Sequence, residues 1–284
     1  MAVITTARFP RLERARHRVE LEFDNLGGHA LFFWRALAAI PKAVTAYPKE
    51  TLRLIAEIAM GTGALAVIGG TVVIVGFLTL ATGGVIAVQG FSSLSDIGVE
   101  ALTGFFAAFI NVRIAAPVIA GIGLAATIGA GATAQLGAMR VAEEIDALEV
   151  MAIDSVAYLV STRIVAGMIA VVPLYSLAVI ASFLASRFAT VNIYGQSGGI
   201  YDHYFATFLI PSDILWSFVQ AIAMAITIML IHTYSGYNAA GGPAGVGAAV
   251  GSAVRTSLIA VVTVTLLVSL AVYGSDGNFN LSGG

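Results

Sequence analysis

Long apolar segments alternate with short polar segments along the chain. No ionisable residue occurs between Glu57 and Asp96, a stretch longer than the roughly 20 residues that a membrane-spanning helix needs. Four further apolar segments follow the same pattern. The pattern therefore predicts five spans, at about residues 58–88, 113–139, 157–188, 211 to 232 or 237, and 256–273.

Three other segments are apolar or aromatic but do not fit a complete span. Residues 101–112 are too short to cross, so we expect a half-helix or a re-entrant piece on the outer side. Residues 27–57 place Phe32, Phe33 and Trp34 beside basic residues, which favours an amphipathic helix in the membrane plane over a first span. The tyrosines of residues 189–210 suit the outer headgroup belt.

Residues 140–154, between the second and third spans, form a short acidic run. On a helix, one narrow stripe would contain Val141, Ile145, Leu148 and Ala152, with the acids on the rest of the surface. Such a helix is too charged to span a bilayer, and we expect it to lie on the membrane surface with its stripe facing down. Its exposed acids could bind a soluble partner, or they could be solvated charges on a connector.

Two segments are rich in small residues. Gly121, Ala125, Gly129, Thr133 and Gly137 recur every four residues on one helix face, which permits close helix packing within the chain or across a dimer seam. The run at residues 241–251 (GGPAGVGAAVG) follows a helix rather than a strand and lacks a lysine, unlike a phosphate-binding loop. We expect it to be a turn, with Gly247 and Gly251 packed tightly at the start of the last span.

Composition fixes the class of protein. The chain is 58% hydrophobic and only 11% charged, and its mean hydropathy is +0.93. A soluble domain of this length could not bury so much apolar surface, so we expect an all-α integral membrane protein. The absence of cysteine excludes disulfides, Cys-ligated zinc and iron–sulfur clusters. The neighbours Asp202 and His203 cannot surround an ion by themselves, so no metal site is predicted.

Charge indicates the orientation. Residues 1–26 hold five arginines, and the excess of basic residues in cytoplasmic segments places this arm in the cytoplasm. The arm is not expected to be a signal peptide, because no apolar core follows the arginines. Five spans then place the tail, residues 274–284, outside. The acidic helix, the Gly-rich turn, Arg140, Arg163 and Arg255 fall on the cytoplasmic side.

Two absences narrow the function. The predicted spans carry almost no ionisable residue at mid-depth, which disfavours an ion-coupled transporter. The only lysines, Lys42 and Lys49, do not follow a glycine, so no ATP-binding loop is predicted and no cofactor is expected. Active transport would therefore need a separate ATPase, with the acidic helix as its natural contact. The histidines His29, His203 and His232 have no evident partners, and no catalytic constellation is predicted.

The run Gln135–Met151 (QLGAMRVAEEIDALEVM) resembles the signature of the MlaE/YrbE permeases. These are membrane subunits of ABC transporters that act on lipids together with MCE (mammalian cell entry) proteins. The EEIDAL core is highly specific, and the Gly-rich run before the last span is a supporting match. The resemblance covers about residues 30–275, and the basic arm and the Ala-, Gly- and Val-rich composition look like the actinobacterial branch.

The resemblance implies five transmembrane helices after an interfacial helix, in a plasma-membrane permease domain at residues 58–273. It implies a second, sister permease, two ATPase subunits on the cytoplasmic side and MCE proteins outside. It also implies that fatty acids, sterols or phospholipids are imported through a cavity between the two permeases. The helix between spans 2 and 3 would be the coupling helix that contacts the ATPase. The implied site residues are Arg140, Glu143, Glu144, Asp146, Leu148 and Glu149 for coupling, Gly241, Gly242, Gly245 and Gly247 for the cytoplasmic turn, and Gly121, Ala125, Gly129 and Gly137 for permease packing. The residues that contact lipid are not predicted, because an apolar cavity recognises chains by shape.

The sequence also departs from the family pattern. The run Arg113–Pro117 (RIAAP) stands where the family has Arg-Glu-Leu-Gly-Pro, so the glutamate is missing. Thr127 stands where an arginine is common, and Gln135 where a glutamate is common. These changes suggest that an intramembrane charge network has been dismantled, and that this chain is one half of a heterodimer. The alternative function is a structural scaffold without transport, which predicts that charge reversal at Glu143 and Asp146 leaves transport intact.

Overall fold

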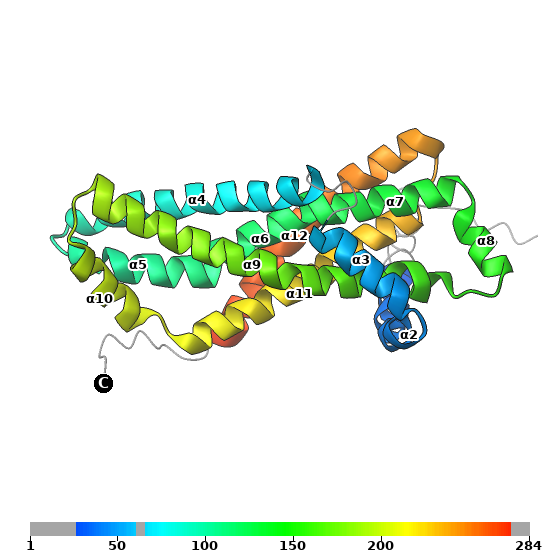
Figure 1. Cartoon of the computed structure of the whole chain (residues 1–284), viewed down its shortest axis with the longest axis horizontal. Coiled ribbons are helices and arrows are strands. Elements are labelled where there is room, and N and C mark those ends of the chain that lie inside the picture. Colours follow the sequence, from blue (N-terminus) through cyan, green and yellow to red (C-terminus); the bar gives the residue numbers. More distant parts are fainter. Residues whose placement is uncertain (1–26, 61–65, 274–284) are drawn as a thin grey trace, which may run out of the picture.

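The computed structural model describes residues 27–60 and 66–273, and this part of the chain is helical, without strands (Figure 1). Five helices are long and apolar enough to cross a membrane. They cover residues 70–95, 100–141, 156–193, 211–237 and 242–272. The chain is thus an all-α, multi-pass membrane protein with five spans, as the apolar pattern predicted.

The first span is α4 (Ala66–Ser95), and the fourth is α11 (Pro211–Tyr237), which begins and ends as predicted. The second span joins η1 (Glu100–Leu102), α5 (Thr103–Ile110), η2 (Asn111–Ala115), α6 (Ala116–Leu124), η3 (Ala125–Gly129) and α7 (Ala130–Val141). The third joins η4 (Val156–Ser161), α9 (Thr162–Phe188) and η5 (Ala189–Ile193). The turn helix α10 (Gly198–Phe208) lies at one end of the bundle, and α8 (Glu144–Val150) lies at the other (Figure 1).

The second span is longer than predicted. The expectation of a separate half-helix at residues 101–112 is wrong, because these residues continue directly into the rest of the span through η2. Its 42 residues extend about 63 Å at 1.5 Å per residue, roughly twice the hydrocarbon thickness. The π-helical turn η2 ends just before Pro117, which cannot donate the ordinary hydrogen bond, so the wider turn absorbs the interruption.

The first and last spans also begin elsewhere than predicted. Residues up to Met60 belong to α3 (Pro48–Met60), and α4 starts at Ala66. The last span, α12 (Gly242–Tyr273), begins 14 residues before the predicted Thr256. The Gly-rich run therefore forms its first turns, helped by Pro243, whose missing N–H needs no partner near a helix start. The basic arm 1–26 and the tail 274–284 lie outside the described residues.

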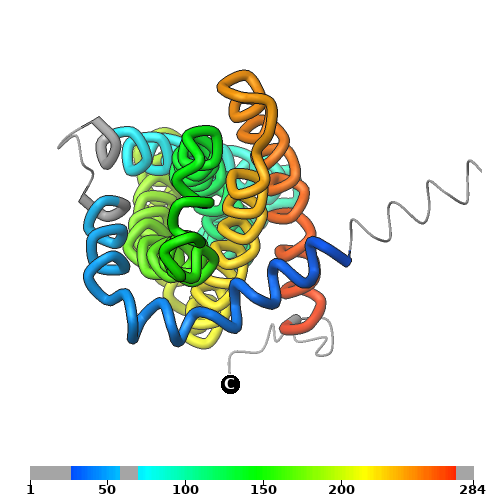
Figure 2. Tube along the Cα trace, turned by 90° about the vertical axis from the view of Figure 1, so that its right-hand side faces the viewer, coloured from blue at the N-terminus to red at the C-terminus, as the bar shows by residue number. Residues whose placement is uncertain are grey.

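The predicted interfacial helix consists of three segments: residues 27–38, α2 (Ile40–Ala46) and α3. The break at Tyr47 precedes Pro48, whose ring disfavours helical geometry in the residue before it. Figure 2 shows these segments passing around the periphery of the bundle at its α8 end. Trp34 is 71% exposed, and its contact with a membrane surface stays a prediction.

The core lies where α4, α6, α9, α11 and α12 meet, around Leu124, Tyr175 and Met224. The glycines of the small-residue stripe on the second span face α11 and α12. A Cβ atom at Gly121 would lie 3.0 Å from Val261 of α12, and one at Gly129 would lie 2.6 Å from His232 of α11. Gly137 faces Val246 in the same way. Of the two alternatives, the stripe therefore serves packing within the chain, where missing side chains let helix backbones approach.

Candidate functional site

The acidic helix α8 is shorter than predicted and forms the tip of the hairpin between the second and third spans. Arg140 and Val141 still belong to α7, and α8 covers only Glu144–Val150. Left-handed residues stand on both sides of it, Glu143 with φ 59° and Ala152 with φ 59°. These two sharp bends turn the chain out of α7 and back toward α9, so α8 lies across the end of the bundle (Figures 1 and 2).

The apolar stripe of α8 packs on the protein itself. Ile145 is fully buried against Leu136 of α7 and Leu159 of η4, and Leu148 is partly buried beside them. Val141 and Ala152, the other predicted stripe positions, are exposed because they lie outside α8. The predicted burial of the whole stripe in the membrane surface is therefore wrong: its centre anchors α8 to the ends of the spans.

Two of the predicted acidic residues have structural partners. Arg140 Nη1 donates to Asp146 Oδ1 over 2.6 Å. Glu149 Oε1 accepts hydrogen bonds from Ser155 Oγ at 2.8 Å and from the Tyr237 hydroxyl at 3.1 Å. Glu149 thus ties the end of α8 to the last residue of α11 through one carboxylate oxygen, and its side chain stays exposed.

The remaining residues of this tip form an exposed surface. Glu143 and Glu144 are exposed, and within residues 27–60 and 66–273 neither side chain has a hydrogen bond or ion pair. Val150 is 88% exposed and Met151 is 61% exposed. We call Glu143, Glu144, Val150 and Met151 the α8 tip. The sequence pattern missed its two apolar members, which lie off the predicted stripe.

A second ion pair holds the chain after α8. Lys42 Nζ of α2 donates to Asp154 Oδ2 over 2.7 Å, although 112 residues separate them. This hydrogen bond lowers the pKa of Asp154 below its ordinary value, against the opposing effect of partial burial, and a hydrogen bond from the Ala157 N–H acts in the same direction. The segment 27–60 is thereby joined to the hairpin that carries α8.

The Gly-rich start of α12 lies beside the end of α7. Gly241 and Gly242 have φ values of 91° and 69°, a backbone conformation that favours glycine. A Cβ at Gly245 would lie 1.7 Å from the Ala240 carbonyl oxygen, so no larger residue fits. The predicted packing of Gly247 and Gly251 is not found: Cβ positions there meet nothing within 4 Å or only the Arg255 side chain. A groove of about 310 Å³, which Val141 and Val246 help to line, lies between the end of α7 and the start of α12.

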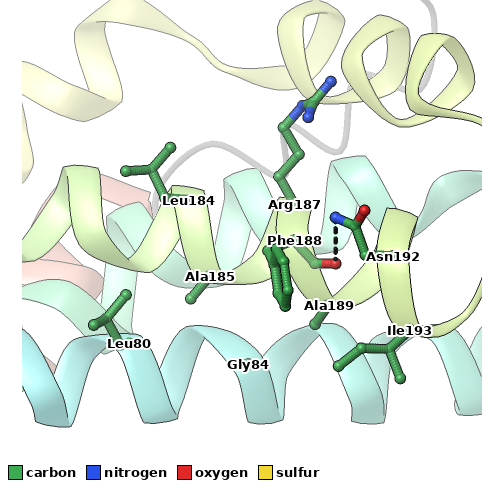
Figure 3. Close-up of a pocket in the computed structure, with 9 residues that line it drawn as sticks. All are labelled: Leu80, Gly84, Leu184, Ala185, Arg187, Phe188, Ala189, Asn192 and Ile193. Atoms are coloured by element: carbon green, nitrogen blue, oxygen red, sulfur yellow. Dashed lines mark hydrogen bonds between the residues drawn. The ribbon is translucent and has the colours of Figure 1, made fainter.

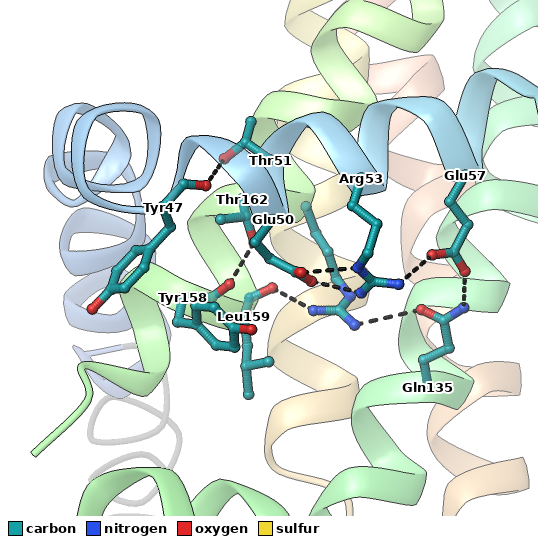
Figure 4. A network of polar contacts seen from close by, with 10 residues as sticks. Tyr47, Glu50, Thr51, Arg53, Glu57, Gln135, Tyr158, Leu159 and Thr162 are labelled. Atoms are coloured by element: carbon teal, nitrogen blue, oxygen red, sulfur yellow. Dashed lines mark hydrogen bonds and ion pairs between the residues drawn. The ribbon is translucent and has the colours of Figure 1, made fainter. Parts of the chain in front are cut away.

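A polar network joins α3 to the second and third spans (Figure 4). Arg53 pairs with Glu50 at 2.6 Å and with Glu57 at 3.0 Å. Gln135 Nε2 donates to Glu57 over 3.2 Å, and Gln135 Oε1 accepts from Arg163 over 3.5 Å. The hydrogen bonds from Arg53 lower the pKa of Glu50. Although Gln135 stands where a glutamate is common in the family, it still belongs to a polar network that includes the charged residues Glu57 and Arg163.

Several other polar contacts were not predicted. Arg113 donates two hydrogen bonds to Asp213 Oδ2, at 3.0 and 2.7 Å, 100 residues away on α11. His232 is fully buried, with Nδ1 2.7 Å from the Thr133 hydroxyl, and His29 packs on Tyr234 at 4.1 Å between ring centroids. The expectation that these histidines lack partners is thus wrong. Arg163, placed near a membrane interface by the charge rule, is buried within the bundle.

Comparison with known proteins gives one family. A family profile described as "Permease MlaE" matches residues 60–271. A probable ABC transporter permease protein of Rickettsia bellii is 31% identical over 153 residues, which cover 54% of this chain and 59% of that protein. A similar protein of Synechocystis is 26% identical over 166 residues, covering 58% and 63%.

The similarity extends to a plastid protein. TRIGALACTOSYLDIACYLGLYCEROL 1 of Arabidopsis thaliana, described as chloroplastic, is 28% identical over 166 residues, or 58% of this chain and 47% of that protein. The matches to the rickettsial proteins span about 59% of their length.

Proposed function

The chain belongs to the MlaE permease family, and we propose that it is the transmembrane permease subunit of an ABC transporter that moves lipids across the plasma membrane. A separate ATPase supplies the energy by docking on the α8 tip. A sister permease completes the pore, and MCE proteins extend it outside. The N-terminus and the α8 end face the cytoplasm, and the α10 end faces outward.

The geometry of α8 carries the proposal. A helix that only connected two spans would need no anchor, whereas α8 is held by the buried Ile145, the Arg140–Asp146 pair and the Glu149–Tyr237 contact. These contacts fix α8 to α7, η4 and α11 together. A movement of the α8 tip would therefore be transmitted directly to three spans. Coupling to an ATPase requires such a transmission.

Two observations support a lipid as the substrate. The Arabidopsis relative is named after trigalactosyldiacylglycerol, a lipid, and the EEIDAL run resembles permeases that work with MCE proteins. The imported lipid is a fatty acid, a sterol or a phospholipid. The proposal of a heterodimer is based on two departures from the family pattern: the missing glutamate in the Arg113–Pro117 run, and Thr127 in place of an arginine. Purification of a homodimer that transports lipid without a sister subunit would refute that part.

Affinity purification through this chain in mild detergent tests the docking surface. Glu143→Lys combined with Glu144→Lys reverses two charges that have no described partner, so no described contact is lost. The matched control is Asp96→Lys with Glu100→Lys, the same charge change on exposed residues at the other end. We expect the wild type and the control to bring down an ATPase subunit and a sister permease, and the α8 variant to lose the ATPase alone.

Retention of the ATPase by the α8 variant would contradict docking at the α8 tip. If the wild type brings down no ATPase but other membrane proteins, the scaffold alternative replaces the proposed function. Loss of the sister permease as well would indicate a folding defect. In that case Glu143→Gln with Glu144→Gln, which removes charge without reversing it, repeats the test.

A further inference from the structure

A groove runs along the outside of the bundle between α4 and α9, near η5 (Figure 3). Its volume is about 560 Å³, within the range of roughly 300–1,000 Å³ that is typical of small-molecule sites. Leu80 and Gly84 of α4 form one wall, and Leu184 and Phe188 of α9 form the other. Both walls lie within candidate membrane spans.

Two adjacent glycines create this groove. A Cβ at Gly83 would lie 2.5 Å from the Ser182 carbonyl oxygen, so α4 and α9 touch closely at that residue. A Cβ at Gly84 would meet nothing within 4 Å. The missing side chain of Gly84 therefore leaves open space next to the point where the helices are held together.

The lining is mostly apolar, and its two polar side chains are Asn192 of η5 and Arg187 of α9. Leu80, Leu184 and Phe188 are exposed on the bundle surface, where the solvent in a membrane is acyl chains. Near η5, the Asn192 amide donates to the Phe188 carbonyl over 3.2 Å (Figure 3). Arg187 extends from α9 away from α4 (Figure 3), and its guanidinium pairs with Asp202 of α10 through two 2.8 Å hydrogen bonds. Such a lining suits a molecule with one long apolar part and one polar end.

The Arg187–Asp202 pair leaves room for an anion. Both side chains are about half exposed, 48% for Arg187 and 51% for Asp202, and an exposed pair of this kind contributes little stability. Guanidinium groups bind phosphate oxygens in the same forked geometry as carboxylates. A phosphate can therefore share Arg187 with Asp202 or replace it.

We propose that this groove binds one acyl chain of a membrane phospholipid, with the phosphate beside Arg187. This rests on the proposed function and deepens it: phospholipid is the class of lipid that reaches the permease sideways from the bilayer, on the α4–α9 face. With the α10 end outward, the headgroup belongs to the outer leaflet.

The test uses a phospholipid with a photoreactive group in its acyl chain, incorporated into membranes that contain the full-length chain and its partners. After illumination, labelled peptides are mapped by mass spectrometry. We expect labels to concentrate on residues 80–84 and 184–193. Gly84→Leu fills the groove and should reduce this labelling at least fivefold. The matched control is Gly76→Leu, a glycine of α4 with open space that does not line the groove, and it should label like the wild type.

Variants at the polar end test the position of the phosphate. Arg187→Gln should reduce labelling by the phospholipid, whereas Asp202→Asn, which releases Arg187 from its partner, should maintain or increase it. Equal losses in both variants would mean that the ion pair acts only by holding α10, and would overturn the phosphate contact. A photoreactive fatty acid that labels the groove while the phospholipid does not would overturn the choice of phospholipid.

Labels spread evenly over the exposed faces of α4 and α9, or equal labelling of Gly84→Leu and Gly76→Leu, would show only non-specific boundary lipid and overturn the proposal. The test is separate from that of the proposed function, because labelling requires no ATP. If the wild type brings down no ATPase but the groove is labelled as expected, the proposed function is refuted and the groove is not. If the ATPase binds as expected but the groove is not labelled specifically, lipid binding in the groove is refuted and the proposed function is not.

Discussion

At the scale of single residues, close helix approach depends on which glycines face a neighbour. A Cβ at Gly236 of α11 would lie 2.7 Å from the Thr133 carbonyl oxygen and 2.9 Å from Leu136 Cβ, whereas one at Gly131 of α7 would meet nothing within 4 Å. Sequence spacing located the small residues on one face of the second span. It could not show which of them oppose a backbone, because that depends on the partner helix.

This difference predicts opposite outcomes for one substitution. Gly236→Ala should destabilise the protein by about 1–3 kcal/mol through overpacking and lower its melting temperature in detergent. Gly131→Ala should leave the melting temperature unchanged or slightly raised, since alanine favours helix more than glycine does. Equal melting temperatures for the two variants would contradict the described packing of α7 on α11.

The Lys42–Asp154 pair predicts a pH dependence. The pKa of Asp154 is lowered in the folded protein from its ordinary value of 3.8, so its contribution to stability is present above that value and is lost as pH falls through the folded pKa. We expect hydrogen exchange in α2 to quicken as pH falls below about 4, after correction for the intrinsic rate. In Asp154→Asn, exchange should already be faster at neutral pH and should change less on acidification. An unaltered pH response in that variant would contradict the role of the pair.

At the scale of elements, α8 shows what an apolar pattern can and cannot predict. The existence of a helix with Ile145 on its apolar stripe follows from the pattern of residues 140–154, but the burial of Ile145 against α7 and η4 does not. The bounds of α8 do not follow either, because they depend on left-handed backbone at Glu143 and Ala152, residue types that seldom adopt it. The same holds for the second span, where a 42-residue helix continues through two π-helical turns.

Two substitutions can distinguish the residue that anchors α8 to the bundle from a residue to which the ATPase would bind. Ile145→Ala removes a buried side chain, at a cost of about 2–5 kcal/mol, and should raise hydrogen exchange across α8 and weaken ATPase binding. Val150→Ala alters an exposed side chain of the α8 tip and should weaken ATPase binding while leaving exchange unchanged. If Ile145→Ala leaves the exchange of α8 unchanged, Ile145 does not anchor the helix.

At the scale of the whole molecule, the sequence predicted the class, the five spans and the order of the elements. It missed the contacts that join distant segments. Lys42 and Asp154 are 112 residues apart, and Arg113 and Asp213 are 100 apart. Each pair consists of ordinary charged residues without a local signature, so only the arrangement of the helices reveals it. The groove beside Gly84 was also missed, because it too depends on how α4 and α9 are arranged.

The proposed orientation can be measured directly because the sequence contains no cysteine. Single substitutions Ala147→Cys in α8 and Ser95→Cys at the end of α4 both change exposed residues. A membrane-impermeant maleimide added to intact cells should label the Ser95→Cys variant, and should label the Ala147→Cys variant only after permeabilisation. The opposite pattern would reverse the orientation and place the α8 tip beyond reach of a cytoplasmic ATPase.

Site-specific photo-crosslinking in native membranes, with a photoreactive amino acid at Val150, tests whether an ATPase binds at the α8 tip. Ile97, an exposed apolar residue at the other end of the bundle, serves as the control position. We expect Val150 to crosslink to a subunit with an ATP-binding loop, and Ile97 not to. Absence of that adduct at Val150, or its equal appearance at Ile97, would contradict coupling through the α8 tip.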